Sequence, residues 1–107
     1  MAAKVLGQLA PASATYTGAI YAVPSGKEAI CSTLSVSNRA STTDTFRVRV
    51  AIADATSDNK QWLAYDVAVA GNSIVPVTIG ITLAATDKVY VGSNGGNLTF
   101  QLFGDER

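Results

Sequence analysis

The chain has 107 residues, of which 48% are hydrophobic and 15% are charged, and its formal net charge is zero. This length supplies one domain with its own core, and the low charge fraction excludes a disordered tail and favours a surface that meets another protein. The balanced charge lacks the basic patch that nucleic acids require, and no apolar run is long enough to span a membrane, so we expect neither partner.

The first residues, MAAKVLGQLAPASA, contain a single Lys and no continuous apolar run of the kind a signal peptide has. We therefore expect a protein that is made and used in a cytoplasm or carried out of one inside a larger assembly. Residues 1–14 are either an extended N-terminal arm that adds to a neighbouring molecule or the first strand of the fold. Residues 15–107 form the domain itself.

Strand-forming residues dominate the rest of the chain, turn residues recur about every eight to twelve positions, and no convincing helix is predicted. A first strand ends near Val23, before the turn residues Pro24 and Gly26. The next run places Ile30, Leu34 and Val36 on one face.

Residues 44–53, DTFRVRVAIA, give the clearest alternation of the sequence. The face that we expect in the core consists of Phe46, Val48, Val50 and Ile52. Arg47, Arg49 and Ala51 lie on the other face. The polar link before this run predicts a hairpin that joins it to the preceding strand.

A polar loop then leads to WLAYDVAV, with Trp62 at a strand edge, and a Gly-Asn turn leads to the run from Ile74. Pro76 removes one ladder donor, so this strand is an edge strand or bulges. KVYV is a short strand, residues 92–97 (GSNGGN) predict a flexible hairpin, and the last run has one buried face, formed by Leu98, Phe100 and Leu102.

This pattern predicts an all-β fold, a single compact antiparallel β-sandwich of about seven or eight strands, of jelly-roll or immunoglobulin-like type. The last run needs neighbours on both sides, so we expect it to be an interior strand.

Residues that carry chemistry are scarce. The chain has no His and one cysteine, Cys31, so we expect no disulfide, no metal or cofactor, no catalytic residues and no enzyme activity. Asp54, Asp58 and Asn59 are close enough in sequence to suggest calcium, but their spacing does not match an EF-hand, and we interpret them as solvated loop residues. Asp87 is expected to accept local backbone hydrogen bonds at a turn.

Aromatic residues offer a second possibility for function. A sugar-stacking face is one interpretation of these rings, and packing in the core and on the sheets is the one that we favour. The residues concerned are Tyr16, Tyr21, Trp62, Tyr65 and Tyr90. Arg47 and Arg49 either pair with acids of a neighbouring subunit or form a solubilising stripe, and both interpretations remain open.

Short motifs along nearly the whole chain resemble a group of small virion proteins of tailed bacteriophages. They are YAVPSGK, the SNR turn followed by a Phe-led strand, LAYD, ITLAATD and the terminal FQLFG. The resemblance implies a non-enzymatic virion structural protein that is assembled in the host cytoplasm. Its most favoured role is that of a capsid decoration, or cement, protein.

The resemblance also implies partners: the major capsid protein or tail proteins of the same virion, and further copies of the chain, with a homotrimer preferred. The candidate interface residues are Lys4, Val5, Leu6, Leu9, Arg47, Arg49 and Trp62. The alternative is an accessory protein of the tail, baseplate or fibres whose loops 54–60 and 92–97 contact a glycan or receptor on the host.

Overall fold

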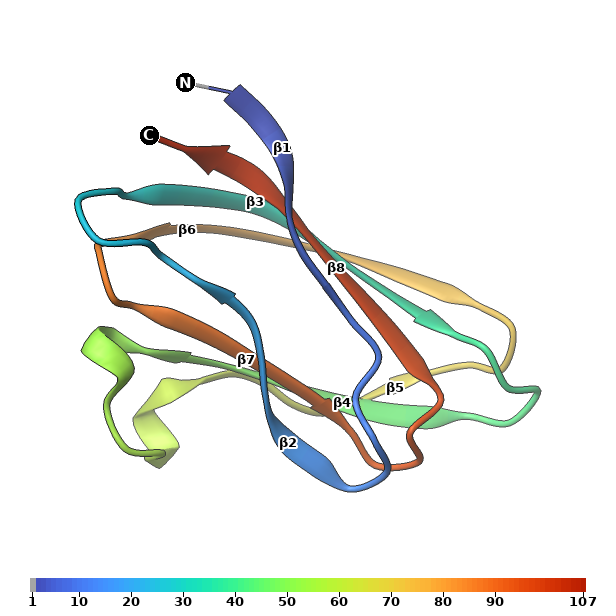
Figure 1. The fold of residues 1–107 in the computed structure, drawn as a ribbon. Coiled ribbons are helices and arrows are strands. Elements are labelled where there is room, and N and C mark those ends of the chain that lie inside the picture. The colour runs from blue at the N-terminus through green and yellow to red at the C-terminus, as the bar shows by residue number, and fades with distance from the viewer. Residues whose placement is uncertain (1) are drawn as a thin grey trace.

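The computed structural model describes residues 2–107, which form an all-β fold (Figure 1). The strands are β1 (Ala2–Leu9), β2 (Thr15–Ala22), β3 (Ala29–Asn38), β4 (Asp44–Ala51), β5 (Trp62–Val69), β6 (Ile74–Leu83), β7 (Lys88–Ser93) and β8 (Leu98–Glu106). Two short 3-10 turns, η1 (Ile52–Asp54) and η2 (Asn59–Gln61), lie between β4 and β5. The all-β class predicted from the sequence is confirmed.

The strands form two four-stranded antiparallel sheets, in the orders β1-β8-β3-β6 and β2-β7-β4-β5. Figure 1 shows β3 and β6 of one sheet above β4, β5 and β7 of the other, which are the two layers of a β-sandwich. Strand β8 lies between β1 and β3, so the prediction of an interior final strand is confirmed. We call the two layers the β8 sheet and the β7 sheet after one interior strand of each.

The core lies between the two layers and follows the predicted alternation in its centre. Leu98, Phe100 and Leu102 of β8 are fully buried. Phe100 meets Phe46 of the opposite sheet edge to face, with ring centroids 6.0 Å apart. Because successive strand residues point to opposite faces, these alternating residues fill one apolar layer.

Strand β3 departs from simple alternation. Both of its ladders shift register between Cys31 and Thr33, so a β-bulge forms at Ser32. A bulge reverses which residues face the core, and Cys31 is buried whereas Ile30 is only half-buried. The prediction that Ile30 shares a core face with Leu34 is therefore wrong.

The predicted hairpin between β3 and β4 is also wrong, because these strands belong to different sheets. The buried Asn38 holds the crossing between the layers. Its side-chain amide donates to the carbonyl oxygens of Thr42 (2.8 Å) and Val69 (3.0 Å), and its carbonyl oxygen accepts from the backbone N–H of Ala40. A polar link fits both kinds of connection, so its composition did not distinguish them.

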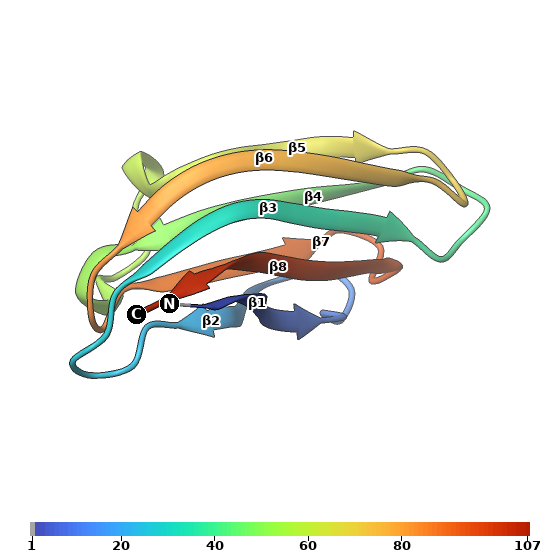
Figure 2. The same cartoon turned by 90° about the horizontal axis from the view of Figure 1, so that it is seen from above.

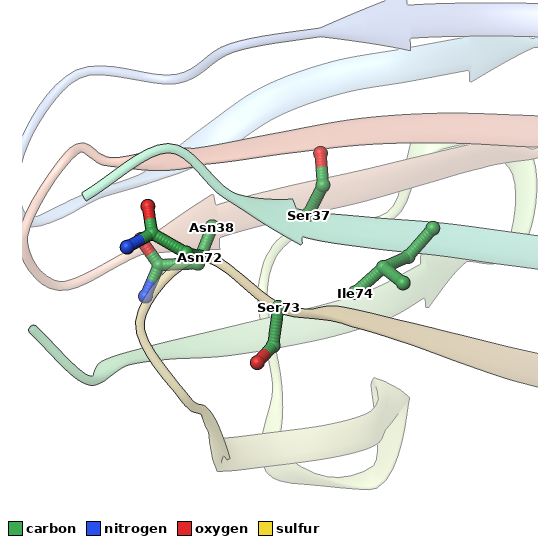
Figure 3. Close-up of a pocket in the computed structure, with 5 residues that line it drawn as sticks. All are labelled: Ser37, Asn38, Asn72, Ser73 and Ile74. Atoms are coloured by element: carbon green, nitrogen blue, oxygen red, sulfur yellow. The ribbon is translucent and has the colours of Figure 1, made fainter. Parts of the chain in front are cut away.

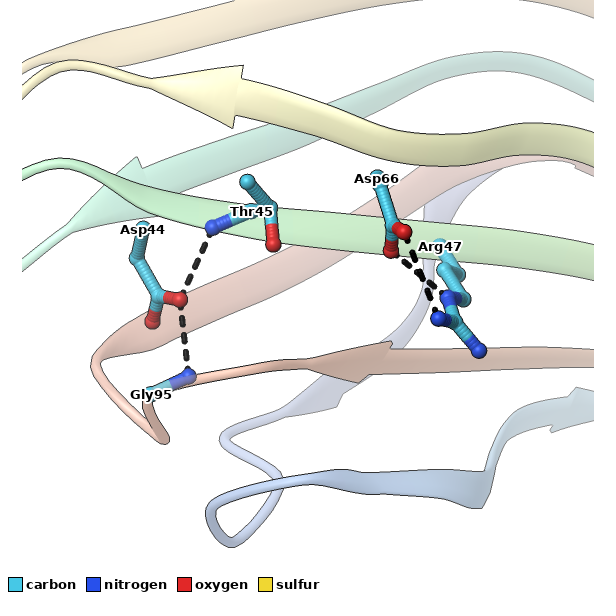
Figure 4. A network of polar contacts seen from close by, with 5 residues as sticks. All are labelled: Asp44, Thr45, Arg47, Asp66 and Gly95. Atoms are coloured by element: carbon cyan, nitrogen blue, oxygen red, sulfur yellow. Dashed lines mark hydrogen bonds and ion pairs between the residues drawn. The ribbon is translucent and has the colours of Figure 1, made fainter.

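Residues 92–97 likewise cross between sheets and do not form the predicted hairpin. The buried carboxylate of Asp44 fixes this loop from β4 (Figure 4). It accepts hydrogen bonds from the backbone N–H groups of Gly95 (2.7 Å), Asn97 (3.2 Å) and Thr45 (2.8 Å). A buried carboxylate needs such donors, and here they tie the loop to the sheet.

The end of β4 corrects another prediction. The strand ends at Ala51, and Ile52 is 71% exposed rather than in the core. Ala53 and Asp54 adopt left-handed backbone conformations that turn the chain away from the sheet. Asp87 accepts hydrogen bonds from the N–H groups of Ala53 (2.8 Å) and Ala84 (2.9 Å), which confirms its expected role at the turn.

The sandwich has one closed side. Strand β1 approaches β2 so closely that a Cβ on Gly7 would lie 2.0 Å from the carbonyl oxygen of Ile20. Leu6 and Leu9 of β1 also pack against the core. Residues Ala2–Leu9 are thus an edge strand on β8, and an extended arm is not confirmed; Met1, included in the predicted range 1–14, lies outside the described residues.

The other side carries the edge strands β5 and β6, which overlap in the view of Figure 2 but lie in separate layers in Figure 1. Pro76 lies on β6, which is at the edge of its sheet, so of the two alternatives predicted for this strand the edge strand is confirmed. Within the described chain β6 pairs only with β3 and β5 only with β4, so no ladder joins these two edges.

Candidate functional site

Arg47 of β4 lies among three aromatic side chains on the β7 sheet. Its guanidinium carbon is 4.2 Å from the ring centroid of Tyr16 and 4.0 Å from that of Tyr65. The Trp62 ring is 5.8 Å from the same carbon and meets Tyr65 edge to face. These contacts have the geometry of cation–π interactions. With Asp66, these residues form what we call the Arg47 platform.

Asp66 orients the guanidinium of Arg47 (Figure 4). Arg47 donates from Nε to Oδ1 of Asp66 at 2.7 Å and from a terminal nitrogen to Oδ2 at 3.3 Å. This hydrogen-bonded ion pair raises the pKa of Arg47. Two-point contact fixes the plane of the guanidinium as well as its position.

A β-bulge in β5 directs Asp66 towards Arg47. Register with β4 shifts between Ala64 and Val67, and Asp66 has a φ of 54°. Asp tolerates this left-handed conformation better than most residues, and bulges commonly redirect side chains. The unusual backbone thus places the carboxylate beside the guanidinium.

Gly92 of β7 makes room for Tyr16. It pairs directly with Arg47, and a Cβ at this position would lie 2.2 Å from the carbonyl oxygen of Thr15 and 2.6 Å from Cδ1 of Tyr16. Only glycine leaves space for β2 to pass so close. Tyr16 therefore reaches Arg47 across the position where β7 has no side chain.

A second polar cluster continues from the platform towards η1 and η2. Arg49 is only 7% exposed; it donates to Oε1 of Gln61 at 2.8 Å, and its guanidinium carbon lies 4.0 Å from the Tyr90 ring centroid. Asp54 accepts hydrogen bonds from the Tyr90 hydroxyl and from Lys88 Nζ (3.0 Å). These bonds lower the pKa of Asp54 and raise those of Tyr90 and Lys88.

Chemically, the platform offers contact surface and hydrogen-bonding groups. Tyr65 is 55% exposed, and Trp62 is half-buried beside it. An exposed ring next to an oriented guanidinium and carboxylate suits a partner that presents both apolar area and hydroxyl or amide groups. Protein surfaces and sugars both have this character.

The candidate interface residues of the sequence fall into two groups. Lys4, Val5, Leu6 and Leu9 lie on β1, where Lys4 pairs with Glu106 (3.4 Å) and Val5 is 47% exposed. Arg47, Arg49 and Trp62 are brought together on the β7 sheet.

The aromatic residues divide between the core and a sheet face, the two kinds of packing in the favoured interpretation. Tyr21 is buried and donates to Glu106 at 2.6 Å. Tyr16, Tyr65 and Tyr90 contact the arginines of β4. Sequence reasoning missed Asp66, Gln61 and Gly92, because only the bulge and the pairing of distant strands bring them to the arginines.

Other possible sites carry less chemistry. Cys31 is fully buried, and burial raises its pKa to about 11, which disfavours the reactive thiolate. Asp58, considered above as a calcium ligand, lies at the start of η2, and its backbone N–H donates to Oε1 of Gln61 at 3.4 Å. Among residues 2–107, no three His, Cys, Asp or Glu side chains converge as a metal ion requires.

An open hollow of about 630 Å³ lies beside the turn that leads into β6 (Figure 3). It is lined by Ser37, Asn38, Asn72, Ser73 and Ile74. The Asn38 amide is used within the fold, and the Ser73 hydroxyl donates to the carbonyl oxygen of Gly71. None of these five lining residues is ionisable, and the side chains of Asn38 and Ser73 already form hydrogen bonds within the fold.

None of the described residues forms a helix with the length and apolar character needed to span a membrane. Comparison of the chain with models of protein families, with curated proteins and with solved structures gives no match.

Proposed function

We propose that this chain is a non-enzymatic structural protein of a bacteriophage virion, with capsid decoration as its leading role. In this role, symmetric copies bind the major capsid lattice and stabilise the assembled head by mass action, because each contact exists only in the assembled state. A homotrimer is the preferred form. The phage-like motifs described above support the assignment.

The strand order is the observation that carries this proposal. The pairs β1–β8, β2–β7, β3–β6 and β4–β5 nest within one another and divide between two sheets. This is the arrangement of a long hairpin rolled into two Greek keys, and it favours the jelly roll over the immunoglobulin-like sandwich. Jelly rolls are common among viral capsid proteins and lectins, so the order favours both capsid decoration and glycan binding.

The copy number of the protein in purified virions tests the decoration role. Quantitative mass spectrometry should give a ratio near one copy per major capsid subunit. A ratio far below one would reject lattice-wide decoration and favour the tail, baseplate or fibres. Absence from purified virions would reject the virion role altogether.

A host-surface glycan is the second candidate partner, and the Arg47 platform favours it. The exposed Tyr65 ring provides a stacking surface, and Asp66 and Arg47 provide hydrogen-bonding groups beside it. The loops 54–60 and 92–97 would add contacts, although Asp44 fixes the second loop within the fold.

Binding of host cell-wall polysaccharide tests this candidate. Tyr65→Ala should weaken binding about tenfold, which corresponds to about 1.4 kcal/mol, as expected for the loss of one stacking ring. Leu63→Ala is the matched control, because Leu63 is an equally exposed apolar residue on the same strand. Equal binding by the wild type and Tyr65→Ala would exclude the platform as the glycan site.

A further inference from the structure

The side of the sandwich that carries β5 and β6 leaves more large apolar side chains exposed than the opposite side does. No ionisable residue occurs between Asp66 and Asp87, a stretch that includes the end of β5 and all of β6. Edge strands usually carry charges that discourage association. β6 lacks them along its whole length, and on β5 the charge of Asp66 is paired with Arg47.

The inward row of β6 is incompletely covered. Its members pack against the core but remain half-exposed; they are Val75, Val77, Ile79 and Ile81. Val67 on β5 is exposed as well. We call these five residues the β5–β6 strip. Ile74 is also exposed, but it pairs with Ser37 and therefore lies on the outer face of β6, outside the strip.

The opposite side shows how the same fold closes an edge. There Gly7 lets β1 touch the backbone of β2, and Leu9 lies over Gly18. Lys4 and Tyr21 both bond to Glu106 on that side. The half-exposed row of β6 has no equivalent closure in the described chain, so apolar area remains open to solvent.

We propose that a second copy of this chain covers the β5–β6 strip in a closed homo-oligomer. The inference rests on the homo-oligomer of the proposed function and identifies its surface. The strip offers no charge by which an oppositely charged partner would be selected, and a chain of zero net charge does not repel its own copies. A second copy of the chain presents the same apolar, uncharged surface and therefore matches the strip.

The available area is sufficient for such a contact. Ten residues of β6, at about 3.4 Å per residue, extend about 34 Å, and the smallest dimension of the molecule is 18 Å. The projected area of this side is therefore about 600 Å². The accessible surface of protruding side chains exceeds their projected area, which brings it near the roughly 800 Å² that each partner buries in a stable interface.

The backbone of β6 favours side-chain packing over extension of the sheet. Pro76 has no N–H to donate, and Gly80, with a φ of 52°, lies where the β3–β6 register shifts. Both features interrupt a continuous ladder on the open edge. Two copies therefore meet through apolar side chains, and not through backbone hydrogen bonds that would extend the sheet from one copy to the next.

Sedimentation analysis of the full chain and three variants tests the inference. The wild type should have a mass of at least twice 11.0 kDa, and Val67→Lys and Val77→Lys should each shift it to the monomer. Ile74→Lys is the control, because Ile74 is an exposed apolar residue on the other face of the same strand, and it should keep the wild-type mass. Circular dichroism checks that each variant is folded.

A wild-type chain that stays monomeric would overturn the inference, and so would an oligomer that both lysine variants retain. The virion copy number is measured separately, so a virion protein with a different oligomer surface would be distinguished from a failure of the virion role. The melting temperature provides a second readout: it should rise with concentration for the wild type and Ile74→Lys but not for the two monomeric variants.

Discussion

Gly92→Ala tests whether the close passage of β2 over β7 builds the Arg47 platform. The added Cβ would lie 2.2 Å from the carbonyl oxygen of Thr15, whereas ordinary contacts of this kind begin at 3.4 Å. The backbone of β2 must therefore move by about 1.2 Å, the difference between these two distances. The neighbouring hydrogen bond from Ala14 N–H to the Asn94 carbonyl oxygen, now 2.9 Å, would lengthen beyond hydrogen-bonding range.

Loss of this bond and weakening of the Thr15–Ser93 pairing should lower the free energy of unfolding by about 1–3 kcal/mol, at about 1 kcal/mol for each backbone hydrogen bond. Equilibrium unfolding in urea measures the change, and fluorescence of Trp62, the single tryptophan, reports on the platform at the same time.

Gly18→Ala is the matched control on β2. The nearest atom to its added Cβ is Cδ2 of Leu9, at 2.6 Å, which is the end of a side chain that can rotate away. This variant should therefore be less destabilised than Gly92→Ala. Equal stability of Gly92→Ala and the wild type, with unchanged Trp62 fluorescence, would refute the claim that glycine is required for the platform.

Three further outcomes are expected. Phe100→Ala should cost about 3–5 kcal/mol in urea unfolding, whereas Ile52→Ala, at an exposed turn, should cost under 1 kcal/mol; similar costs would contradict the location of the core. The folded state holds the Cys31 thiol neutral up to a pKa of about 11, against 9.0 for a free thiol, so the free energy of unfolding should fall by up to about 3 kcal/mol as pH rises through this interval. Cys31→Ala should lack this part of the pH dependence, and an unchanged dependence would exclude the thiol as its source. Asp66→Val should be about 1–2 kcal/mol less stable in urea than Asp66→Asn, because Asn tolerates a φ of 54°; equal stabilities would indicate that the bulge is not maintained.

Local alternation predicted the parts of the fold in which strands run without interruption. Leu98, Phe100 and Leu102 were expected in the core and are buried there, and Pro76 was expected on an edge strand or at a bulge and lies on the edge strand β6. In these places side-chain period and backbone chemistry act within a few residues. No information from distant strands was needed.

Bulges and sheet crossings escaped the prediction because their causes are not local. Ile30 has the sequence context of a core residue, but the bulge at Ser32 reverses its face. Similarly, the link after Asn38 is long enough for a hairpin, but Asn38 bonds to Val69, a residue of the opposite sheet. Neither outcome can be derived from spacing alone.

The candidate site was predicted only in part. Alternation placed Arg47 and Arg49 on one face of their strand, and both lie beside aromatic rings. Their partners come from later in the chain: Gln61 is the last residue of η2, and Asp66 lies on β5. The β4–β5 register and its bulges determine those contacts, and no residue pattern encodes them visibly.

The nested pairing also governs when each strand can find its partner during synthesis. Strands β4 and β5 are separated only by the segment containing η1 and η2, so they can pair early, whereas β1 must wait until β8 has left the ribosome. Closing the long outer loops costs more entropy than closing the inner one, so we expect folding to proceed outwards from the middle of the chain and to be slow for a domain of this size. Until β8 arrives, β1 and β3 both lack a neighbour, and the nascent chain exposes two strands that any other β-rich chain could capture.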